Sequence, residues 1–308
     1  MALPLIRLGT RGSKLALTQT GLVRDALAAA DIGLPAHAIE IVPIKTTGDV
    51  IQDRPLSEAG GKGLFVKEIE EALLAGRIDA AVHSMKDMPT TQPTGLSIAA
   101  FLPREDARDV LIASGAKRIG DLKQGALVGT SALRRRAQLL HRRPDLRIVN
   151  LRGNVDTRLR KLEAGEVEAT ILASAGLRRL GLTHVGAVIP EDEMLPAVGQ
   201  GAVCIECRDD DRKVRDWVRA INHAATEIAV LAEHAMLAIL DGSCRTPIAG
   251  HATLDSEGNV HLRAQIARPD GSQLIATERR GPIREAQHLG RDAGLELKVR
   301  GGPDFFKD

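Results

Sequence analysis

Short apolar runs alternate with helix-forming stretches over the first two thirds of this 308-residue sequence. Residues 5–10, 39–44 and 78–82 have the apolar character of strands, and a helical pattern covers 65–74. Ser13 stands where it can cap a helix after the first of these strands. Alternation of this kind is typical of mostly parallel α/β sheets, whose ligand sites lie beyond the carboxyl ends of the strands.

The chain then repeats this pattern in a second unit. Further strands are predicted at 110–113, 126–128, 147–149 and 169–172. The segment 195–201 (LPAVGQG) is a loop that leads to one more strand at 202–206. We expect this strand to return to the first unit, which makes the first domain discontinuous.

The last part of the chain has a different pattern. A helix is predicted at 224–240, a final helix at 283–297, and alternating strands at 248–254, 260–267 and 272–278. The alternating strands suit an antiparallel meander, with a turn signal at Asp270-Gly271. The sequence therefore predicts three domains: 1–103 completed by 201–221, then 104–200, then 222–308.

Composition argues against several classes of function. The 42 basic and 40 acidic residues leave a net charge of +2, which excludes a globally basic nucleic-acid-binding protein. Aromatic residues make up only 2%, with no tyrosine, so base stacking on single-stranded nucleic acid is disfavoured. No stretch approaches the roughly 18 apolar residues of a membrane span, and the first residues lack a signal-peptide pattern. We expect a cytoplasmic protein that binds neither nucleic acid nor membrane.

Arginines gather after two predicted strands. The 31 arginines outnumber the 11 lysines, a bias that suits an anionic ligand and equally suits a GC-rich genome. Arg134 and Arg135 follow the strand at 126–128, and Arg152 follows the strand at 147–149. Strand ends at one sheet edge would make an anion site, and a solvated basic face is the equally weighted alternative. For the other arginines of this run, the solvated face is favoured: Arg136, Arg142 and Arg143.

Two shorter segments are candidates for a site. The glycine-rich stretch 60–63 lacks the spacing of a phosphate-binding loop and is better interpreted as a flexible lid. Asp87 follows the strand at 78–82 and stands next to Lys86. A structural ion pair between these two is the commoner outcome, and a catalytic acid in a crevice lined with arginines is the alternative.

The three cysteines divide into two kinds. Cys204 and Cys207 fall on or beside the strand at 202–206 and are interpreted as buried thiols, because no second pair or histidine cluster completes a metal site. Cys244 lies in a loop next to Arg245, where a lowered thiol pKa would make it a nucleophile. On these residues alone, an inert thiol remains the favoured interpretation of Cys244. An odd number of cysteines argues against a disulfide framework as the basis of the fold.

Eight ordered segments resemble the hydroxymethylbilane synthase family, also called porphobilinogen deaminases. They are LGTRGSKLAL (8–17), GGKGLFVKEIE (60–70), DAAVHSMKDMP (79–89), GTSALRRRAQL (129–139), LRGNVDTRL (151–159), ILASAGLRRLG (171–181), LPAVGQGAVCIECR (195–208) and DGSCRTPIAG (241–250). The resemblance covers nearly the whole chain. It implies two binding-protein-like α/β domains with mixed sheets around a cleft, and a smaller α+β C-terminal domain with an antiparallel sheet.

The resemblance also implies an activity and a cofactor. Members join four porphobilinogen molecules head to tail, with release of ammonia, to give the linear tetrapyrrole hydroxymethylbilane. They do so on a dipyrromethane primer bound through a thioether to the cysteine that matches Cys244. The catalytic aspartate matches Asp87, whose charge would face the pyrrole nitrogens. We expect a monomeric transferase without a metal.

The remaining site residues follow from the same resemblance. The cofactor-binding set is Lys86, Thr130, Ser131, Arg134, Arg135, Arg152, Gly153 and Ser174, and the substrate-binding set is Arg11, Ser13, Arg158 and Arg178. The mobile loop of the family matches Gly60, Gly61, Lys62 and Gly63. Two positions depart from the family pattern: Ser243 replaces a frequent glycine, and Ala132 replaces a serine of some members. The competing interpretation is a non-enzymatic two-domain anion-binding protein, which would need neither Asp87 nor Cys244.

Overall fold

The computed structural model describes residues 5–50, 63–242 and 246–306. The chain divides into two compact units. Of the described residues, the first unit comprises 5–50, 63–104 and 202–227, and the second comprises 105–201, 228–242 and 246–306. The second unit holds both the middle and the C-terminal sheets, so the predicted division into three domains stays a prediction.

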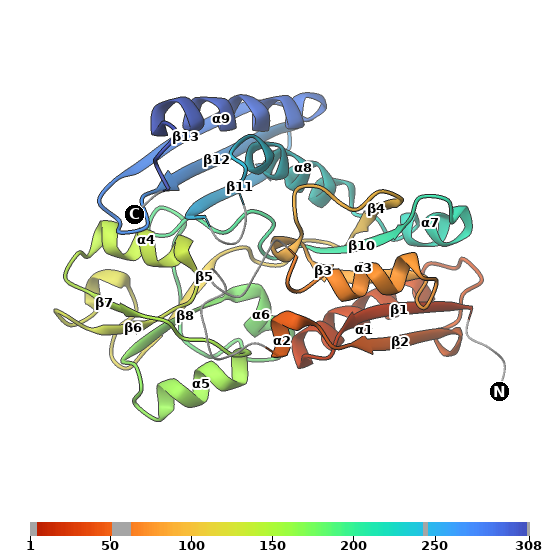
Figure 1. The fold of residues 1–308 in the computed structure, drawn as a ribbon, viewed down its shortest axis with the longest axis horizontal. Coiled ribbons are helices and arrows are strands. Elements are labelled where there is room, and N and C mark those ends of the chain that lie inside the picture. Colours follow the sequence, from red (N-terminus) through yellow and green to blue (C-terminus); the bar gives the residue numbers. More distant parts are fainter. Residues whose placement is uncertain (1–4, 51–62, 243–245, 307–308) are drawn as a thin grey trace. The chain divides into compact units, whose positions relative to one another are not determined.

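The first unit is built on a five-stranded sheet (Figure 1). Its order is β2-β1-β3-β10-β4, with bounds β1 (Ile6–Arg11), β2 (Ile39–Ile44), β3 (Ala80–Ser84), β4 (Leu96–Phe101) and β10 (Val203–Arg208). β1 is parallel to β2 and β3, whereas β10 is antiparallel to β3 and β4. The prediction that the strand after LPAVGQG returns to the first unit is therefore confirmed.

Three helices pack against this sheet: α1 (Lys14–Ala29), α3 (Lys67–Leu74) and α7 (Arg212–Arg219). The unit also contains the short helix α2 (Thr47–Val50) and the 3-10 turns η1 (Ala36–Ala38) and η2 (Met85–Asp87). Ser13 caps α1 as predicted, because its side chain accepts a hydrogen bond from the Ala16 amide. Leu27 of α1 and Ile69 of α3 are fully buried in two separate apolar clusters. These clusters hold the sheet between its helices.

The middle part of the chain forms a second five-stranded sheet with the order β7-β6-β8-β5-β9. Its strands are β5 (Asp109–Ala113), β6 (Leu127–Gly129), β7 (Arg147–Val149), β8 (Ala169–Ala173) and β9 (Ala187–Val188). The helical segments are η3 (Ile119–Asp121), α4 (Leu133–Arg142), α5 (Val155–Glu163) and α6 (Ser174–Arg179). β6 is parallel to β7 and β8, and β5 is antiparallel to β8 and β9.

Both five-stranded sheets are mixed, as the family resemblance implied. The expectation of mostly parallel strands, drawn from the alternation alone, was wrong. In each sheet two neighbouring pairs are parallel and two are antiparallel. In the first sheet the reason is that β10, which follows the LPAVGQG loop, enters between β3 and β4 and runs opposite to both. β4 follows β3 after only the η2 turn and a proline-containing segment, and it was absent from the predicted strands.

The C-terminal part is the predicted antiparallel meander. Its strands β11 (Ile248–Leu254), β12 (Asn259–Ala267) and β13 (Leu274–Pro282) pair in sequence order. α8 (Ala224–Ile239) leads into it, and the turn η4 (Ile283–Glu285) precedes α9 (Ala286–Gly301), which lies along β13 and β12 (Figure 1). β12 alternates, with Val260, Leu262 and Ile266 buried in the core. No described helix is both long and apolar enough to cross a membrane.

Two glycines let α9 approach α8 closely. A Cβ atom on Gly290 would lie 2.1 Å from the Ala232 carbonyl oxygen, and one on Gly294 would lie 2.8 Å from the Ile239 Cβ. Distances this short cannot be relieved by a rotamer change, because the first contact is with backbone. The close packing of α9 on α8 therefore requires residues without a side chain at positions 290 and 294.

We predict that Gly290→Ala destabilises the protein by at least about 1–3 kcal/mol, the usual cost of overpacking. Gly21→Ala is the matched control, since Gly21 lies within α1 and a Cβ there meets nothing within 4 Å. That change should stabilise the protein by up to about 1 kcal/mol through helix propensity. Urea unfolding of both variants measures the two changes in the free energy of unfolding. A destabilisation of both variants, or a stabilisation of both, would contradict the close packing inferred at Gly290.

Candidate active site

Asp87 lies at the carboxyl-terminal edge of the first sheet. β3 ends at Ser84, and the η2 turn that follows is anchored by buried Met85, whose amide donates to the Ala202 carbonyl at 3.0 Å. The Asp87 Oδ2 atom lies 3.8 Å from Nη1 of Arg11, and both side chains are about a quarter exposed. The carboxylate is thus fixed next to a positive charge and remains accessible.

Arg11, at the end of β1, is held from three sides. Its Nε donates to both carboxylate oxygens of Asp49 at 3.2 Å, and its guanidinium carbon lies 4.2 Å from the centre of the Phe65 ring. Burial opposes its charge, but the hydrogen bond to Asp49 and the charge of Asp87 prevail and raise the pKa of Arg11. Arg11 is therefore a rigid cation beside Asp87.

Two side chains that sequence reasoning missed support the same edge. Gln19 of α1 donates to the Ser84 hydroxyl at 2.9 Å, and Ser84 donates back to the Gln19 carbonyl oxygen at 3.1 Å. Gln19 is buried and stands one turn and a half after Ser13 on the same helix. A polar residue on the buried side of an amphipathic helix was the available signal.

In the second unit, two strand ends meet as predicted. β6 and β7 are parallel neighbours, so Thr130 after β6 and Arg152 after β7 lie at one edge. The Thr130 amide donates to the Val149 carbonyl at 2.9 Å. Gly153 has φ +118°, and a Cβ there would lie 2.6 Å from a Thr157 methyl, so only glycine fits.

Arg158 of α5 points to the same edge. Its Nε donates to the Gly153 carbonyl at 2.9 Å, and its Nη2 lies 3.4 Å from the Ser131 hydroxyl. Burial, together with the charges of Arg135 and Arg152, lowers the pKa of Arg158 to about 10. No ion pair to Arg158 is found in the described part of the chain. We call Arg135, Arg152 and Arg158 the arginine cluster, and its positive charge suits an anionic ligand.

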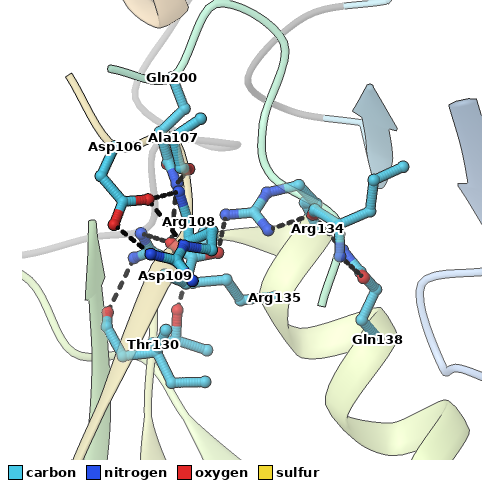
Figure 2. A network of polar contacts seen from close by, with 12 residues as sticks. Asp106, Ala107, Arg108, Asp109, Thr130, Arg134, Arg135, Gln138 and Gln200 are labelled. Carbon is cyan, nitrogen blue, oxygen red and sulfur yellow. Dashed lines mark hydrogen bonds and ion pairs between the residues drawn. The ribbon is translucent and has the colours of Figure 1, made fainter. Parts of the chain in front are cut away.

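A buried aspartate organises the start of α4 (Figure 2). Asp109, the fully buried first residue of β5, accepts from Arg134 Nη2 and from Arg135 Nη2, each at 2.7 Å. Arg135 Nε adds a third contact at 3.2 Å. Burial alone would raise the pKa of Asp109, but the charges of both arginines hold it well below its ordinary range. We call Arg134, Asp109 and Arg135 the Arg–Asp–Arg triad.

The triad also binds backbone and a loop. Arg135 Nη1 donates to the Ile171 carbonyl of β8 at 2.8 Å, and Arg134 Nη1 donates to the Leu195 carbonyl at 2.8 Å. Gln138 exchanges two hydrogen bonds with the Leu195 backbone, and Gln200 donates to Asp109 Oδ1 at 3.0 Å (Figure 2). The LPAVGQG loop is thereby fixed to the arginines. Asp109 neutralises only one of the two, so positive charge remains.

The other predicted residues have varied surroundings. Ser174 is buried and hydrogen-bonds to Asp106. Arg178 is half exposed and pairs with Glu105 at 3.0 Å. Its neighbour Arg179, which was not predicted, donates to the Gly201 carbonyl at 2.8 Å, and burial lowers its pKa against the opposing charge of Glu105.

The structure also describes the residues for which the sequence favoured a role outside the site. Arg136 and Arg142 are exposed, as expected for a solvated face. Arg143 was wrongly placed there: it pairs with Asp145 at 2.7 Å and donates to the Leu122 carbonyl, because it ends α4 against the preceding loop. Cys204 and Cys207 are buried in β10, as predicted.

Several predicted residues lie outside the described part of the chain. They are Gly60, Gly61, Lys62, Ser243 and Cys244. Gly63 is described and has φ +87°. Arg11, Ser13, Lys86 and Asp87 belong to the first compact unit, and the predicted residues from Thr130 to Arg178 belong to the second.

The sequence matches two family models. One, described as "Porphobilinogen deaminase, dipyromethane cofactor binding domain", covers residues 6–216, and one described as "Porphobilinogen deaminase, C-terminal domain" covers residues 227–299. A porphobilinogen deaminase of Paracoccus denitrificans (strain Pd 1222) is 57% identical over 98% of this chain and 96% of its own length. A chloroplastic porphobilinogen deaminase of Oryza sativa subsp. japonica is 52% identical over 98% of this chain and 86% of its own.

Solved structures with a similar fold are more distant. The methionine-binding protein MetQ is 18% identical, with a TM-score of 0.44 over 70% of this chain and 89% of that chain. A putative methionine-binding lipoprotein from Bacillus subtilis subsp. subtilis str. 168 is 12% identical, with a TM-score of 0.45 over 72% of this chain and 91% of its own.

We predict that Asp109→Asn lowers the free energy of unfolding by about 3–5 kcal/mol, because it leaves two buried guanidinium groups with too little negative charge. Since the pKa of Asp109 is depressed, its contribution is present at neutral pH and is lost only as pH falls below about 4. Glu166→Gln is the control, because Glu166 is exposed and lies 4.0 Å from Lys161. Chemical unfolding at neutral pH measures both, and equal losses would contradict a special role for Asp109.

Proposed function

The chain belongs to the porphobilinogen deaminase family, and from this we propose that it joins four porphobilinogen molecules head to tail, with loss of ammonia, to give hydroxymethylbilane. The structural observation that carries the proposal is the arginine cluster beside Thr130 and Ser131, in which Arg158 has a lowered pKa. Each porphobilinogen brings an acetate and a propionate. A growing chain therefore needs many carboxylate-binding groups, and planar guanidinium groups suit carboxylates best.

The residues present fit the dipyrromethane cofactor of the family. Burial first, and then the charges of Arg135 and Arg152, lower the pKa of Arg158, so its guanidinium is buried next to other positive charges. Acid side chains of a dipyrromethane would offset these charges. When bound, the cofactor supplies the pyrrole to which the first substrate molecule is joined.

We propose how the chain's own residues hold this group. Arg134, Arg135 and Arg152 would bind its carboxylates, with hydroxyl or amide donors from Thr130, Ser131, Gly153 and Ser174 and a further charge from Lys86. Arg134 and Arg135 would do so while Asp109 keeps them in position. Cys244 would hold the cofactor through a thioether.

Substrate carboxylates would be bound by Arg11, Ser13, Arg158 and Arg178. Arg179 also suits this role, because it is less exposed than Arg178, whose side chain is half exposed. Arg179 is more buried, and its pKa is lowered by that burial, as for Arg158. We therefore add Arg179 to the proposed substrate-binding residues.

Asp87 is the residue that we propose acts on the chemical step. Its carboxylate is accessible, and Arg11 at 3.8 Å favours its negative charge. A carboxylate in this position accepts hydrogen bonds from pyrrole N–H groups. It also stabilises positive charge that develops on the substrate ring as ammonia departs, without needing to move.

We predict that Asp87→Asn lowers turnover by at least about a hundredfold while the thermal melt stays near that of the wild type, because size is kept and charge is lost. The assay is consumption of porphobilinogen, followed by the porphyrin colour that develops on oxidation in acid. A wild-type protein that gives no colour would contradict the proposed reaction. Near-normal turnover of the variant would contradict the role of Asp87.

We also predict that Cys244 carries the cofactor. The intact mass of the purified protein should exceed that of the sequence by two porphobilinogen units less two ammonia molecules. Cys204→Ser and Cys207→Ser are controls that should keep this increment, since both thiols are buried in β10. Cys244→Ser should lose it. A fully active protein without added mass would overturn this assignment.

The cytoplasmic location and the monomeric state remain predictions from the sequence. A single species of monomer mass in solution would be expected.

A further inference from the structure

Three buried ionisable side chains belong to α3 and to two of the strands that it packs against, β3 and β10, outside the residues discussed so far. Glu70 comes from α3, His83 from β3 and Glu206 from β10. His83 Nε2 lies 3.2 Å from Glu206 Oε2, and these side chains are 3% and 0% exposed. Glu70 is 8% exposed. We call these three residues the acid–histidine cluster.

The cluster contains two carboxylate oxygens without a donor. Oε1 of Glu70 and Oε1 of Glu206 are buried, and neither has a hydrogen-bond partner in the described part of the chain. Buried acceptors of this kind are costly, and two ionised carboxylates that repel each other cost more. A single proton would remove one charge and provide the missing donor.

We propose that the buried carboxyl group of Glu70 holds a proton, and that this proton seats α3 on the sheet and thereby positions Phe65 and Arg11 beside Asp87. Glu70 is in this view a positioning residue. The part that concerns turnover rests on the proposed function, whereas the proton on Glu70 and the seating of α3 do not.

A short series of contacts connects the cluster to Asp87. The residues before α3 form a turn in which the amides of Val66 and Lys67 donate to the Gly63 carbonyl. Phe65, within this turn, packs under the guanidinium of Arg11 at 4.2 Å, and Arg11 lies 3.8 Å from Asp87. A shift of α3 would therefore move the ring that supports Arg11.

Other charged groups near α3 are already engaged or neutral. The elements packed against α3 are β1, β3 and β10, and their ionisable residues are Arg7, Arg11, His83, Cys204, Glu206, Cys207 and Arg208. Arg7 pairs with Asp79, and Arg208 pairs with Asp211 and donates to the Leu73 carbonyl. Burial raises the pKa of both thiols, so they stay neutral. Among the described residues, no group of three or more His, Cys, Asp or Glu could hold a metal ion in place of the proton.

The titration of Glu70 agrees with this geometry. Burial first, and then the charge of Glu206, raise its pKa from the ordinary 4.5 to about 7, and His83 acts in the opposite direction. Between these two values the folded protein binds more protons than the unfolded chain. Stability from Glu70 is therefore present below about pH 4.5 and is lost as pH rises through about 7.

The test compares thermal unfolding of the cofactor-loaded wild type, Glu70→Gln and Glu71→Gln between about pH 5 and pH 9. Glutamine is uncharged at every pH and keeps an N–H donor. The melting temperature of Glu70→Gln minus that of the wild type should therefore increase by about 2 °C or more as the pH is raised from about 5 to about 9. Glu71 lies on the same helix, is exposed and is 3.9 Å from Lys67, so its variant should keep a constant difference. A pH-independent difference for Glu70→Gln would overturn the proposal.

A second measurement needs no variant to fold. At about pH 5 the infrared spectrum of the wild type should contain the carbonyl stretch of a buried protonated carboxylic acid, and this band should be lost with a midpoint near pH 7. Absence of the band at about pH 5 would overturn the proton on Glu70. Neither measurement uses substrate, so both can succeed even in a protein that is inactive toward porphobilinogen.

Turnover tests the positioning role. The wild type should lose turnover as pH rises through about 7, and Glu70→Gln should lack this loss while turnover at lower pH stays within about twofold. A purely structural contact would shift the melt without changing the shape of this pH profile. Identical profiles for the wild type and Glu70→Gln would contradict the link from α3 to Asp87.

Discussion

The carboxylate of Asp109 is the constraint on which the second unit depends. Two guanidinium groups are buried at the start of α4, and neither could stay there without a negative charge. Asp109 supplies that charge to both at 2.7 Å. Because it opens β5, it joins the sheet, α4 and, through Gln200, the LPAVGQG loop in one network.

The net charge of this network explains why the neighbouring strand ends suit an anionic ligand. One carboxylate facing two arginines leaves one positive charge, and Arg158 adds to it at the adjoining strand ends. Burial, and then the charges of Arg135 and Arg152, lower the pKa of Arg158. A ligand with several carboxylates offsets this positive charge, which is what the members of this family require. In the first unit the ratio of charges is the opposite, since one arginine, Arg11, lies near two carboxylates, those of Asp49 and Asp87.

The features of the site that depend on local sequence could be predicted. Ser13 was identified as a cap, and Thr130 and Arg152 were placed at one edge, from strand ends alone. Asp109 was missed because its partners lie 25 and 26 residues away, and no local pattern links them. A charged residue opening an apolar strand was the available signal. The helical period of α4 also separates buried Arg134 and Arg135 from exposed Arg136.

Other parts could not be predicted for identifiable reasons. β4 follows a proline-containing segment and has no crossover helix, so the alternation of strand and helix did not reveal it. Glu70 and Glu206 belong to a helix and a strand that are far apart in sequence, and their unpartnered oxygens emerge only from packing. Arg179 was passed over for Arg178 because the two differ in burial and not in residue type.

A crystal structure of the cofactor-loaded protein tests the role of these arginines most directly. Carboxylates of the dipyrromethane should lie within about 3 Å of guanidinium nitrogens of the arginine cluster, with Asp109 still between Arg134 and Arg135. Cofactor carboxylates directed into solvent, or Asp109 displaced from both arginines, would contradict it.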